Sequence, residues 1–548
     1  MSNEWDTVVV GSGVGGLVCA CYLAAAGLRV LVLEQHDVAG GNAHVFRRRR
    51  AYEFDVGVHY LGDCGDDGIL PAILGGLGLR DRVRFLEMDR DGFDRIVLPS
   101  VTLDVPKGWA RYRERLAAAL PGEAAGIAAF TGIAESVADL VRRNLLDPLS
   151  PAELIRRRAD DVRWSRRTLT QLFDHCGLSD RARTLVAAQS GNYGSAPSRT
   201  SVATHAAMLD HYMRGAYYPQ GGGQALVAAL VEALEAHGGE LRTRCRVARV
   251  PTSGGRARGV LLDDGRLISA PLVVSNADYL RTVLELCDAF PERAVERARA
   301  ATMRLPMAVL YVGLNAELPP LPNANVWAWP REDIERLYQE LYAGRFDTVP
   351  FAFLSFASGK EPVPSACPPG HGNFQVMTLC PPRYAGWGTT AGERYRRNAA
   401  YLMAKRRLTE QLIAMAERLI GPFQRDIAHL ELATPLTHER YVLSSGGSPY
   451  GLERWGTLTA RPDVRSDVEG LYLAGQNTKY GGGIAGAALS GIACAGQILG
   501  RPGLLGEVHG GVTLADPARL PHREPGWDAL QVSRGRARRD ARGLARIG

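Results

Sequence analysis

The chain has 548 residues, of which 46% are hydrophobic and 22% are charged, and its formal net charge is +7. This length suggests two to four domains, and the composition is that of an ordinary globular protein. The sequence has no apolar run of about eighteen residues and no secretory signal, so we expect no membrane-spanning helix and a cytoplasmic location. Its nine cysteines are scattered without a C-x-x-C pair. We therefore expect neither a metal site nor a disulfide framework.

The chain begins with a strand and a glycine-rich turn. Residues 7–10 are β-branched without polar alternation and predict a buried parallel strand. Gly11, Gly13 and Gly16 follow as G-x-G-x-x-G, and residues 14–26 predict a helix. These glycines permit a tight turn, a close approach of the backbone to a pyrophosphate, and close packing of helix and strand. The start of the helix offers free N–H groups and a positive dipole end to phosphates.

The next strand, residues 29–33, ends in an acid, Glu34. A carboxylate there accepts hydrogen bonds from ribose hydroxyls and repels a 2′-phosphate, which disfavours NADP. A second glycine pair and Asn42 come soon after, where a dinucleotide that continues towards a flavin ring would pass. The residues expected to contact the dinucleotide in this region are Gly11, Gly13, Gly15, Gly16, Glu34, Gln35, Gly40, Gly41 and Asn42.

Two long stretches separate this region from the end of the chain. Residues 104–214 have helical spacing, and residues 303–425 begin with the strand-like MAVLYVGL and end in an amphipathic helix. Between them, residues 217–250 predict a helix that stops at Gly238 and then a strand. We expect the two stretches to be insertions.

A last strand, residues 471–474, is followed by a turn at Gly475 and a helix from the glycine run 481–483 to about Leu499. A helix N-terminus of this kind can direct its amides at the edge of a flavin that gains negative charge on reduction. After Gly500 the chain becomes rich in glycine, proline and arginine. We expect a loose basic tail there.

Three segments resemble one superfamily of flavoproteins. The first reads LEQHDVAGGNAHVF and continues as YEFDVGVHYLG up to Gly62. The second, at 217–250, is YYPQGGGQALVAALVEALEAHGGELRTRCRVARV. The third, at 470–499, is GLYLAGQNTKYGGGIAGAALSGIACAGQIL. In this order they resemble the FAD motifs of the phytoene desaturase, carotenoid isomerase and retinol saturase superfamily, and the retinol saturase branch has the most similar wording.

The resemblance spans most of residues 5–500 and implies an α/β fold. It implies a discontinuous Rossmann-like FAD-binding domain around a central parallel sheet, with an inserted α+β substrate domain. We assign residues 1–103, 215–302 and 426–500 to the FAD-binding domain and residues 104–214 and 303–425 to the substrate-binding region. Residues 501–548 remain as the basic C-terminal tail.

The resemblance also implies further contacts with FAD. Val247 would reach the adenine, and the flavin end would be contacted by Gly475, Gln476, Gly483, Ile484 and Ala485. Gln476 stands where the superfamily often has Asp, and Asn42 stands where many relatives have Arg. The sequence has no second G-x-G-x-x-G, so we expect no stable NAD site.

Flavin chemistry on carbon still requires a proton to move, and histidine titrates near neutral pH. His59, in GVHYLG, is the first candidate because the resemblance places its segment near the reactive edge of the flavin. Tyr60 is the second candidate, and His438, in ATPLTHERY, is the third. A role for His59 in packing alone stays open.

The resemblance implies an FAD-dependent oxidoreductase that acts on C=C bonds of a lipophilic conjugated polyene, with hydride transfer at flavin N5. The saturase-like wording favours the reductive direction, either saturation or reductive cyclisation. Desaturation and cis–trans isomerisation stay open as alternatives within this class. Two other classes also stay open: a flavin amine oxidase, which has the same fold, and a flavin-binding scaffold without catalysis.

The partners follow from the same hypotheses. A polyene would be the substrate, and NAD(P)H would be a transient electron donor. Arginine clusters such as residues 47–50 are typical of a solvated surface, and the alternative is docking to an anionic membrane surface or to an acyl carrier protein. No nucleic-acid-binding motif accompanies the charge, so we expect no nucleic acid partner.

Overall fold

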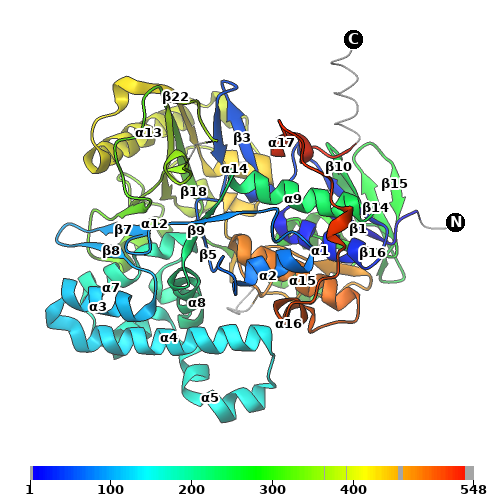
Figure 1. The fold of residues 1–548 in the computed structure, drawn as a ribbon, viewed down its shortest axis with the longest axis horizontal. Coiled ribbons are helices and arrows are strands. Elements are labelled where there is room, and N and C mark those ends of the chain that lie inside the picture. The colour runs from blue at the N-terminus through cyan, green and yellow to red at the C-terminus, as the bar shows by residue number, and fades with distance from the viewer. Residues whose placement is uncertain (1–3, 363–364, 391, 455–460, 537–548) are drawn as a thin grey trace.

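The computed structural model describes residues 4–362, 365–390, 392–454 and 461–536. Two bodies lie side by side in Figure 1. One is built on a five-stranded parallel sheet and the other on a seven-stranded sheet that is almost wholly antiparallel. The chain crosses between them several times, so each body contains segments that are far apart in the sequence.

The five-stranded sheet has the order β10-β2-β1-β16-β24, and all its neighbours are parallel. Its strands are near-continuous runs of Val and Leu because both faces are covered, which is typical of parallel sheets. In the order of the sheet, they are β10 (Glu240–Thr243), β2 (Val30–Glu34), β1 (Thr7–Val10), β16 (Leu272–Ser275) and β24 (Leu471–Leu473).

Helices cover one face of this sheet and a small antiparallel sheet covers the other. The helices are α1 (Val14–Ala25), α9 (Gly222–Ala236), α15 (Gly483–Ile498), α2 (Ile69–Gly76) and α16 (Leu504–His509). The opposite face packs against β11 (Val247–Arg249), β14 (Gly259–Leu262) and β15 (Leu267–Ser269), with α10 (Tyr279–Arg281) and α11 (Glu292–Arg299). Each face therefore has its own hydrophobic core.

The seven-stranded sheet has the order β22-β18-β21-β20-β19-β7-β8. Neighbours are antiparallel except for β19 and β7, which are parallel. In the order of the sheet, the strands are β22 (Ile427–Ala433), β18 (Met307–Leu314), β21 (Gly372–Leu379), β20 (Ala352–Ser355), β19 (Asn325–Ala328), β7 (Asp94–Val97) and β8 (Thr102–Val105).

The helices of the second body pack on this sheet or on one another. They are α3 (Trp109–Ala119), α4 (Ala124–Leu146), α5 (Pro151–Ser165), α6 (Leu169–His175), α7 (Asp180–Val186), α8 (Val202–Met213), α12 (Ile334–Tyr342) and α13 (Ala399–Ile420). By length and composition alone, residues 121–146 would suffice to cross a membrane. The sequence analysis expected no such helix. In the structure α4 runs along the second body (Figure 1), and Ile127, Phe130 and Val137 lie in its core.

Short elements lie outside the two large sheets. Two hairpins, β3 (Val45–Arg48) with β4 (Tyr52–Asp55) and β12 (Thr252–Ser253) with β13 (Arg256–Ala257), are antiparallel. β9 (Ala216–Pro219) pairs with β5 (Leu61–Gly62) and β6 (Phe85–Glu87), and β17 (Thr302–Met303) pairs with β23 (Leu452–Arg454). The remaining helices are α14 (Pro435–Val442) and α17 (Ala529–Val532).

The expected α/β class and central parallel sheet are confirmed. Three segments differ from the sequence expectations. β7 and β22, from stretches assigned to the first domain, pair with β19 and β18 and so belong to the second sheet. The expected strand after α9 is divided into β10 and β11, because Arg244 has a positive φ of 56° and its N–H donates to the carbonyl of His36.

The expectation of a loose C-terminal tail is wrong for the residues that the structure describes. Residues 504–536 pack on the first body, through α16 against α2 and α17 against α9. Arg523 pairs with the buried Glu232 at 2.8 Å. Composition alone suggested a solvated tail, but specific tertiary partners hold this segment in place. Residues 537–548 lie outside the described residues.

Candidate functional site

A cavity of about 600 Å³ lies at the carboxyl ends of β1, β2, β16 and β24, where the first body meets the second. In open α/β sheets, ligands bind in the crevice outside the carboxyl ends of the strands. The far wall of this cavity comes from the second sheet, through Met307 and Val309 of β18, Met377 of β21 and Ala433 of β22. The cavity therefore joins the dinucleotide-binding body to the inserted one.

Most of the predicted cofactor contacts line this cavity. Gly16 and Ala485 do not. A Cβ on Gly16 would lie 2.5 Å from the carbonyl oxygen of Gly11, so this glycine allows close packing and does not face the ligand. The predicted residues that line the cavity are Gly11, Gly13, Gly15, Glu34, Gln35, Gly40, Gly41, Asn42, Val247, Gly475, Gln476, Gly483 and Ile484.

Two helix N-termini meet at the cavity, and neither has a side-chain cap. Helix α1 begins after Gly13 and helix α15 after Gly482, and no side chain accepts from the first N–H groups of either helix. Free N–H groups and aligned dipoles at a helix start favour an anionic group. A Cβ on Gly41 would lie 3.1 Å from the Cα of Gly13, so the second glycine pair keeps the backbone clear beside the first. The residues present fit a dinucleotide with its pyrophosphate at α1.

Glu34 lies in the cavity wall and also holds the turn together. Its carboxylate accepts hydrogen bonds from the backbone N–H of Ser12 at 2.9 Å, from the Ser12 hydroxyl at 2.6 Å and from the N–H of His36 at 2.8 Å. A carboxylate has about four acceptor sites, so one position stays available to a ribose hydroxyl. Sequence reasoning missed Ser12, although it lies between the first two glycines of the motif.

Asn276 is a second residue that sequence reasoning missed. It follows β16 and lines the cavity between the two glycine turns. A Cβ on Gly13 would lie 2.7 Å from its Nδ2 atom, and a Cβ on Gly475 would lie 2.7 Å from its Oδ1 atom. Its position after a third parallel strand, equivalent to that of Glu34 after β2, is the signal that would have found it.

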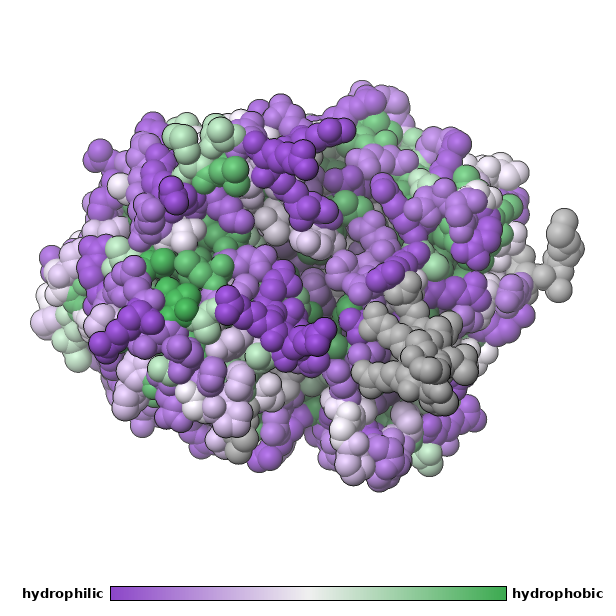
Figure 2. Space-filling view, turned by 90° about the horizontal axis from the view of Figure 1, so that it is seen from above, coloured by the Kyte–Doolittle hydropathy of each residue, from purple (hydrophilic) through white to green (hydrophobic). Residues whose placement is uncertain are grey.

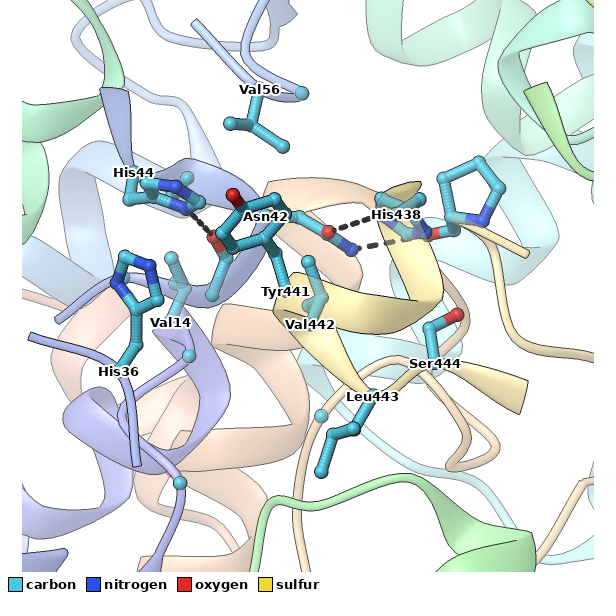
Figure 3. Close-up of a pocket in the computed structure, with 18 of the residues that line it drawn as sticks. Val14, His36, Asn42, His44, Val56, His438, Tyr441, Val442, Leu443 and Ser444 are labelled. Atoms are coloured by element: carbon cyan, nitrogen blue, oxygen red, sulfur yellow. Dashed lines mark hydrogen bonds between the residues drawn. The ribbon is translucent and has the colours of Figure 1, made fainter. Parts of the chain in front are cut away.

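An amide and two histidines form the middle of the cavity wall. Figure 3 shows Asn42 between His44 and His438. The Oδ1 atom of Asn42 accepts from Nε2 of His438 at 2.8 Å, and its Nδ2 atom donates to Oε1 of Gln476 at 3.4 Å. His44 donates through Nδ1 to the carbonyl of Gly41 at 2.6 Å. These hydrogen bonds join the second glycine pair, helix α14 and the turn before α15.

Both of these histidines are neutral at neutral pH. Burial lowers the pKa of His44 to about 4 and that of His438 to about 4. Both rings make hydrogen bonds to neutral amide or carbonyl groups. The carboxylates of Glu34 and Asp37 raise the pKa of His44, but by less than burial lowers it. The predicted acid–base candidate His438 is therefore placed to donate a hydrogen bond.

His59 lies in the cavity wall as predicted, and its backbone is held by a buried lysine. The Nζ atom of Lys360 donates to the carbonyl oxygen of His59 at 2.5 Å and to the hydroxyl of Ser355 at 2.6 Å. Burial and the nearby ammonium lower the pKa of His59 to about 3, and burial lowers the pKa of Lys360 to about 7. Sequence reasoning missed Lys360, which is about 300 residues away along the chain.

Tyr60 is not part of the cavity wall that the structure describes. Its hydroxyl donates to the buried carboxylate of Asp94 at 2.9 Å and accepts from Nδ2 of Asn192 at 2.9 Å. Its ring stacks on Tyr212 with centroids 4.3 Å apart. Successive residues of an extended segment face opposite ways, so His59 reaches the cavity and Tyr60 packs in the core of the second body. The structure gives Tyr60 a packing role.

Towards the second sheet the cavity becomes apolar. Met307, Val309 and Met377 lie in its wall, and Phe46 and Tyr311 make an edge-to-face pair with centroids 4.8 Å apart. The carboxylate in this region, Glu431, is paired with Arg48 at 2.7 Å. Within the described residues this end of the cavity thus offers hydrocarbon, aromatic rings and a charge pair.

The site combines two uncapped helix starts, an acid after β2 and a cavity closed by an antiparallel sheet. These features are typical of flavoprotein oxidoreductases. The comparison with family models agrees. The model described as flavin containing amine oxidoreductase matches residues 14–499, and the chain belongs to this family. FAD is its cofactor, as the sequence motifs predicted, and the expectation of an FAD-dependent oxidoreductase is confirmed.

Two groups of named proteins are similar to this chain over most of its length. An all-trans-retinol 13,14-reductase from Danio rerio is 26% identical over 535 residues, which cover 91% of this chain and 86% of that protein. A chloroplastic prolycopene isomerase from an Oncidium hybrid cultivar is 26% identical over 526 residues, covering 92% and 85%. The predicted membership of the phytoene desaturase, carotenoid isomerase and retinol saturase superfamily is confirmed.

Solved structures show the same fold. A triple mutant of putrescine oxidase superposes with a TM-score of 0.61 at 16% identity and covers 91% of this chain and 99% of its own. An oxidoreductase from Methanosarcina mazei gives a TM-score of 0.59 at 18% identity and covers 89% and 99%. At this identity the likeness concerns the fold alone.

Proposed function

We propose that this protein uses FAD to reduce a C=C bond of a lipophilic conjugated polyene, by saturation or reductive cyclisation. The observation that carries the proposal is the apolar end of the cofactor cavity. There Met307 and Val309 of β18 and Met377 of β21 line the same cavity as the turn at Gly475, which we expect to contact the flavin end. An extended hydrocarbon substrate gains affinity from burying apolar surface, at about 25 cal/mol per Å².

The charges of the cavity separate this proposal from amine oxidation. The nearby histidines His44, His59 and His438 are neutral because burial lowers the pKa of each. Glu431 is already paired with Arg48. An ammonium substrate would have to compete with Arg48 for that carboxylate, whereas an uncharged polyene leaves the pair intact.

When bound, FAD supplies the hydride chemistry. The residues of this chain orient the reactants and exclude water. Asn42, His438 and Gln476 form a hydrogen-bonded set at the flavin turn, and Lys360 fixes the backbone of His59. A neutral imidazole with a pKa of about 3 holds a hydrogen bond well but is a poor proton donor or acceptor. We therefore assign His59 to orientation.

The relatives support the reductive direction, since the retinol reductases match over most of both chains. The sequence identity of these relatives alone does not decide the direction of the reaction. A protein named inactive all-trans-retinol 13,14-reductase from Danio rerio is 27% identical over 530 residues. A direct assay of direction is therefore the central test.

The test incubates the FAD-loaded protein, oxidised or reduced without oxygen, with all-trans-retinol, prolycopene or putrescine, and measures product masses. The proposal expects a gain of two hydrogens in a polyene with the reduced protein only. A loss of two hydrogens, or an unchanged mass with altered retention, would establish desaturation or isomerisation instead. Oxidation of putrescine without polyene conversion would favour an amine oxidase. Bound FAD without conversion of any of the three compounds would contradict the proposal for these substrates and agree with a scaffold.

We also propose NAD(P)H as a transient electron donor. The proposal rests on the reductive direction, which needs a donor, and on a sequence with one dinucleotide motif, already used for FAD. Rapid mixing of the oxidised protein with NADH or NADPH without oxygen should bleach the flavin absorbance in a second-order step. A flavin that neither nucleotide reduces would contradict this assignment.

We propose further that the protein works at an anionic membrane surface, where a polyene would partition. Phe46 and Tyr441 line the cavity, and the exposed Arg49, Arg50 and Arg440 flank them. Figure 2 shows a mainly hydrophilic face with hydrophobic residues in separate islands. Flotation with phosphatidylserine vesicles, but not with phosphatidylcholine vesicles, is expected. Binding to an acyl carrier protein without vesicle binding would favour the other partner considered.

A further inference from the structure

We infer that the C-terminal segment, residues 515–536, is part of the FAD site and closes the adenosine end of the cavity. Leu530 and Arg534 lie in the cavity wall together with Glu34, His36 and Asp37, which follow β2. The family match ends at residue 499, so it does not include this segment. Without the segment, the wall beside the predicted ribose contact would be open.

A buried carboxylate on α9 anchors the segment. Glu232 accepts from Arg523 at 2.8 Å and from the indole Nε1 of Trp527 at 2.7 Å. The guanidinium of Arg523 also lies over the Trp527 ring, 4.1 Å from its centroid. The side chain of Glu232 is only 5% exposed, so breaking this contact would leave a buried charge without its partners.

Backbone contacts attach the following residues to the edge of the parallel sheet. The N–H of Ala39 donates to the carbonyl of Ser533 at 2.8 Å, and the hydroxyl of Thr243 donates to the carbonyl of Arg534 at 2.9 Å. A Cβ on Gly535 would lie 2.4 Å from the carbonyl oxygen of Leu241. The segment therefore covers the edge strand β10 and is fixed to the loop after β2.

The two cavity-facing residues close the wall in different ways. Leu530 is 7% exposed and packs against Val38 and Val45 in a small apolar cluster. The guanidinium of Arg534 lies 3.9 Å from the carboxylate of Asp37 and offsets a negative charge in a cavity that must accept an anionic dinucleotide. Both residues stabilise the loop that carries the ribose contact, so we expect FAD and the docked segment to stabilise each other.

The first test needs no variant. Hydrogen exchange of backbone amides is measured in the native protein with FAD bound and after its removal. Because coupling between two binding events is reciprocal, FAD should slow exchange in residues 527–534 by about tenfold or more. Exchange in α4, far from the cavity, serves as the internal reference. Equal exchange of residues 527–534 in both states would overturn the inference.

The second test compares two substitutions in the C-terminal region. Leu530→Asp places a charge in the cavity wall, whereas Val512→Asp changes an exposed residue that does not line the cavity. FAD dissociation constants are measured by flavin fluorescence. Leu530→Asp should weaken FAD binding by about tenfold or more, the equivalent of losing one buried leucine, and Val512→Asp should leave it unchanged. Equal affinities for the two variants would overturn the inference.

Should Leu530→Asp not fold, Glu232→Gln provides the comparison. It removes the charge that anchors Arg523 and leaves the cavity wall untouched. The FAD dissociation rate should then rise together with the hydrogen exchange rate of residues 523–536. A segment released in this way without faster FAD dissociation would show that it does not belong to the FAD site.

Discussion

At the scale of single residues, the cavity is organised by neutral hydrogen-bonding groups. His59 and His438 were chosen from the sequence because histidine titrates near neutral pH. Burial lowers the pKa of both, to about 3 and about 4. Both residues are therefore uncharged at neutral pH in the fold, and His438 donates a hydrogen bond to Asn42.

The first prediction separates these two roles at His59. His59→Gln keeps a hydrogen-bonding side chain that does not titrate, and it should retain most of the turnover. His59→Ala removes the side chain and should lower turnover by about tenfold, the cost of about one net hydrogen bond, while FAD stays bound. Turnover of the wild type should also show no ionisation of a histidine between about pH 5.5 and 7.5, one unit either side of an ordinary histidine pKa. A hundredfold or larger loss in the Gln variant would instead indicate proton transfer.

The second prediction concerns Gly13. Its φ is ordinary, at −63°, so a side chain there is excluded by space and not by strain. A Cβ would lie 2.7 Å from Nδ2 of Asn276, at the start of α1 and in the cavity wall. Gly13→Val should weaken FAD binding by about 1–3 kcal/mol, the usual penalty for overpacking. The flavin-to-protein ratio after desalting measures this effect, and full occupancy would refute the position of the pyrophosphate.

At the scale of elements, local sequence signals predict where most helices begin and end, whereas tertiary contacts determine which of their faces are buried. Helix α15 starts at the glycine run and ends one residue before the Leu499 expected from the sequence. Helix α4 has enough apolar length to suggest a membrane, yet Ile127 and Phe130 pack in the core of the second body. Apolar length and burial are thus separate properties of one helix.

The third prediction tests the exposed face of α4. Gly132 lies in its middle, is exposed, and a Cβ there would meet no atom within 4 Å. Alanine loses less backbone entropy than glycine in a helix, so Gly132→Ala should raise the free energy of unfolding by about 0.5–1 kcal/mol. Urea denaturation measures the change, and FAD binding should not alter. Destabilisation would show that Gly132 is not an unstrained, exposed helical position.

At the scale of the whole molecule, buried titratable groups make the fold sensitive to acid. The pKa values of His44, His59, His205 and His438 are lowered by burial to about 4, 3, 3 and 4. The unfolded chain binds their protons near pH 6.5, so each histidine costs stability as pH falls below that value. Burial also raises the pKa of Asp55 and Asp94 to about 6, and these two contribute in the opposite sense between pH 6 and their ordinary values.

The fourth prediction follows from this balance of four histidines against two acids. The thermal midpoint of the FAD-saturated protein should fall between pH 7 and pH 5, by the equivalent of about 1.4 kcal/mol per uncompensated histidine and pH unit. His205 is 1% exposed and lies outside the cavity wall, so His205→Gln should lessen the fall without affecting FAD. Differential scanning calorimetry at pH 7 and pH 5 measures the two thermal midpoints. An equal midpoint at both would mean that these histidines are hydrated.

Features that depend on neighbours along the chain could be predicted from the amino-acid sequence. The glycine turns, Glu34 at the end of β2 and the helix after Gly483 were found because each uses a few consecutive residues in a fixed backbone geometry. Features that depend on residues distant along the chain could be identified only in the folded structure. Asn276 meets two glycine turns, Lys360 holds His59, and β7 and β22 join the second sheet. The C-terminal segment is also held by distant residues, because Arg523 pairs with Glu232 and Arg534 pairs with Asp37. Burial and ion pairing arise only in the folded protein. They determine whether a histidine is charged and whether the basic C-terminal segment packs on the first body.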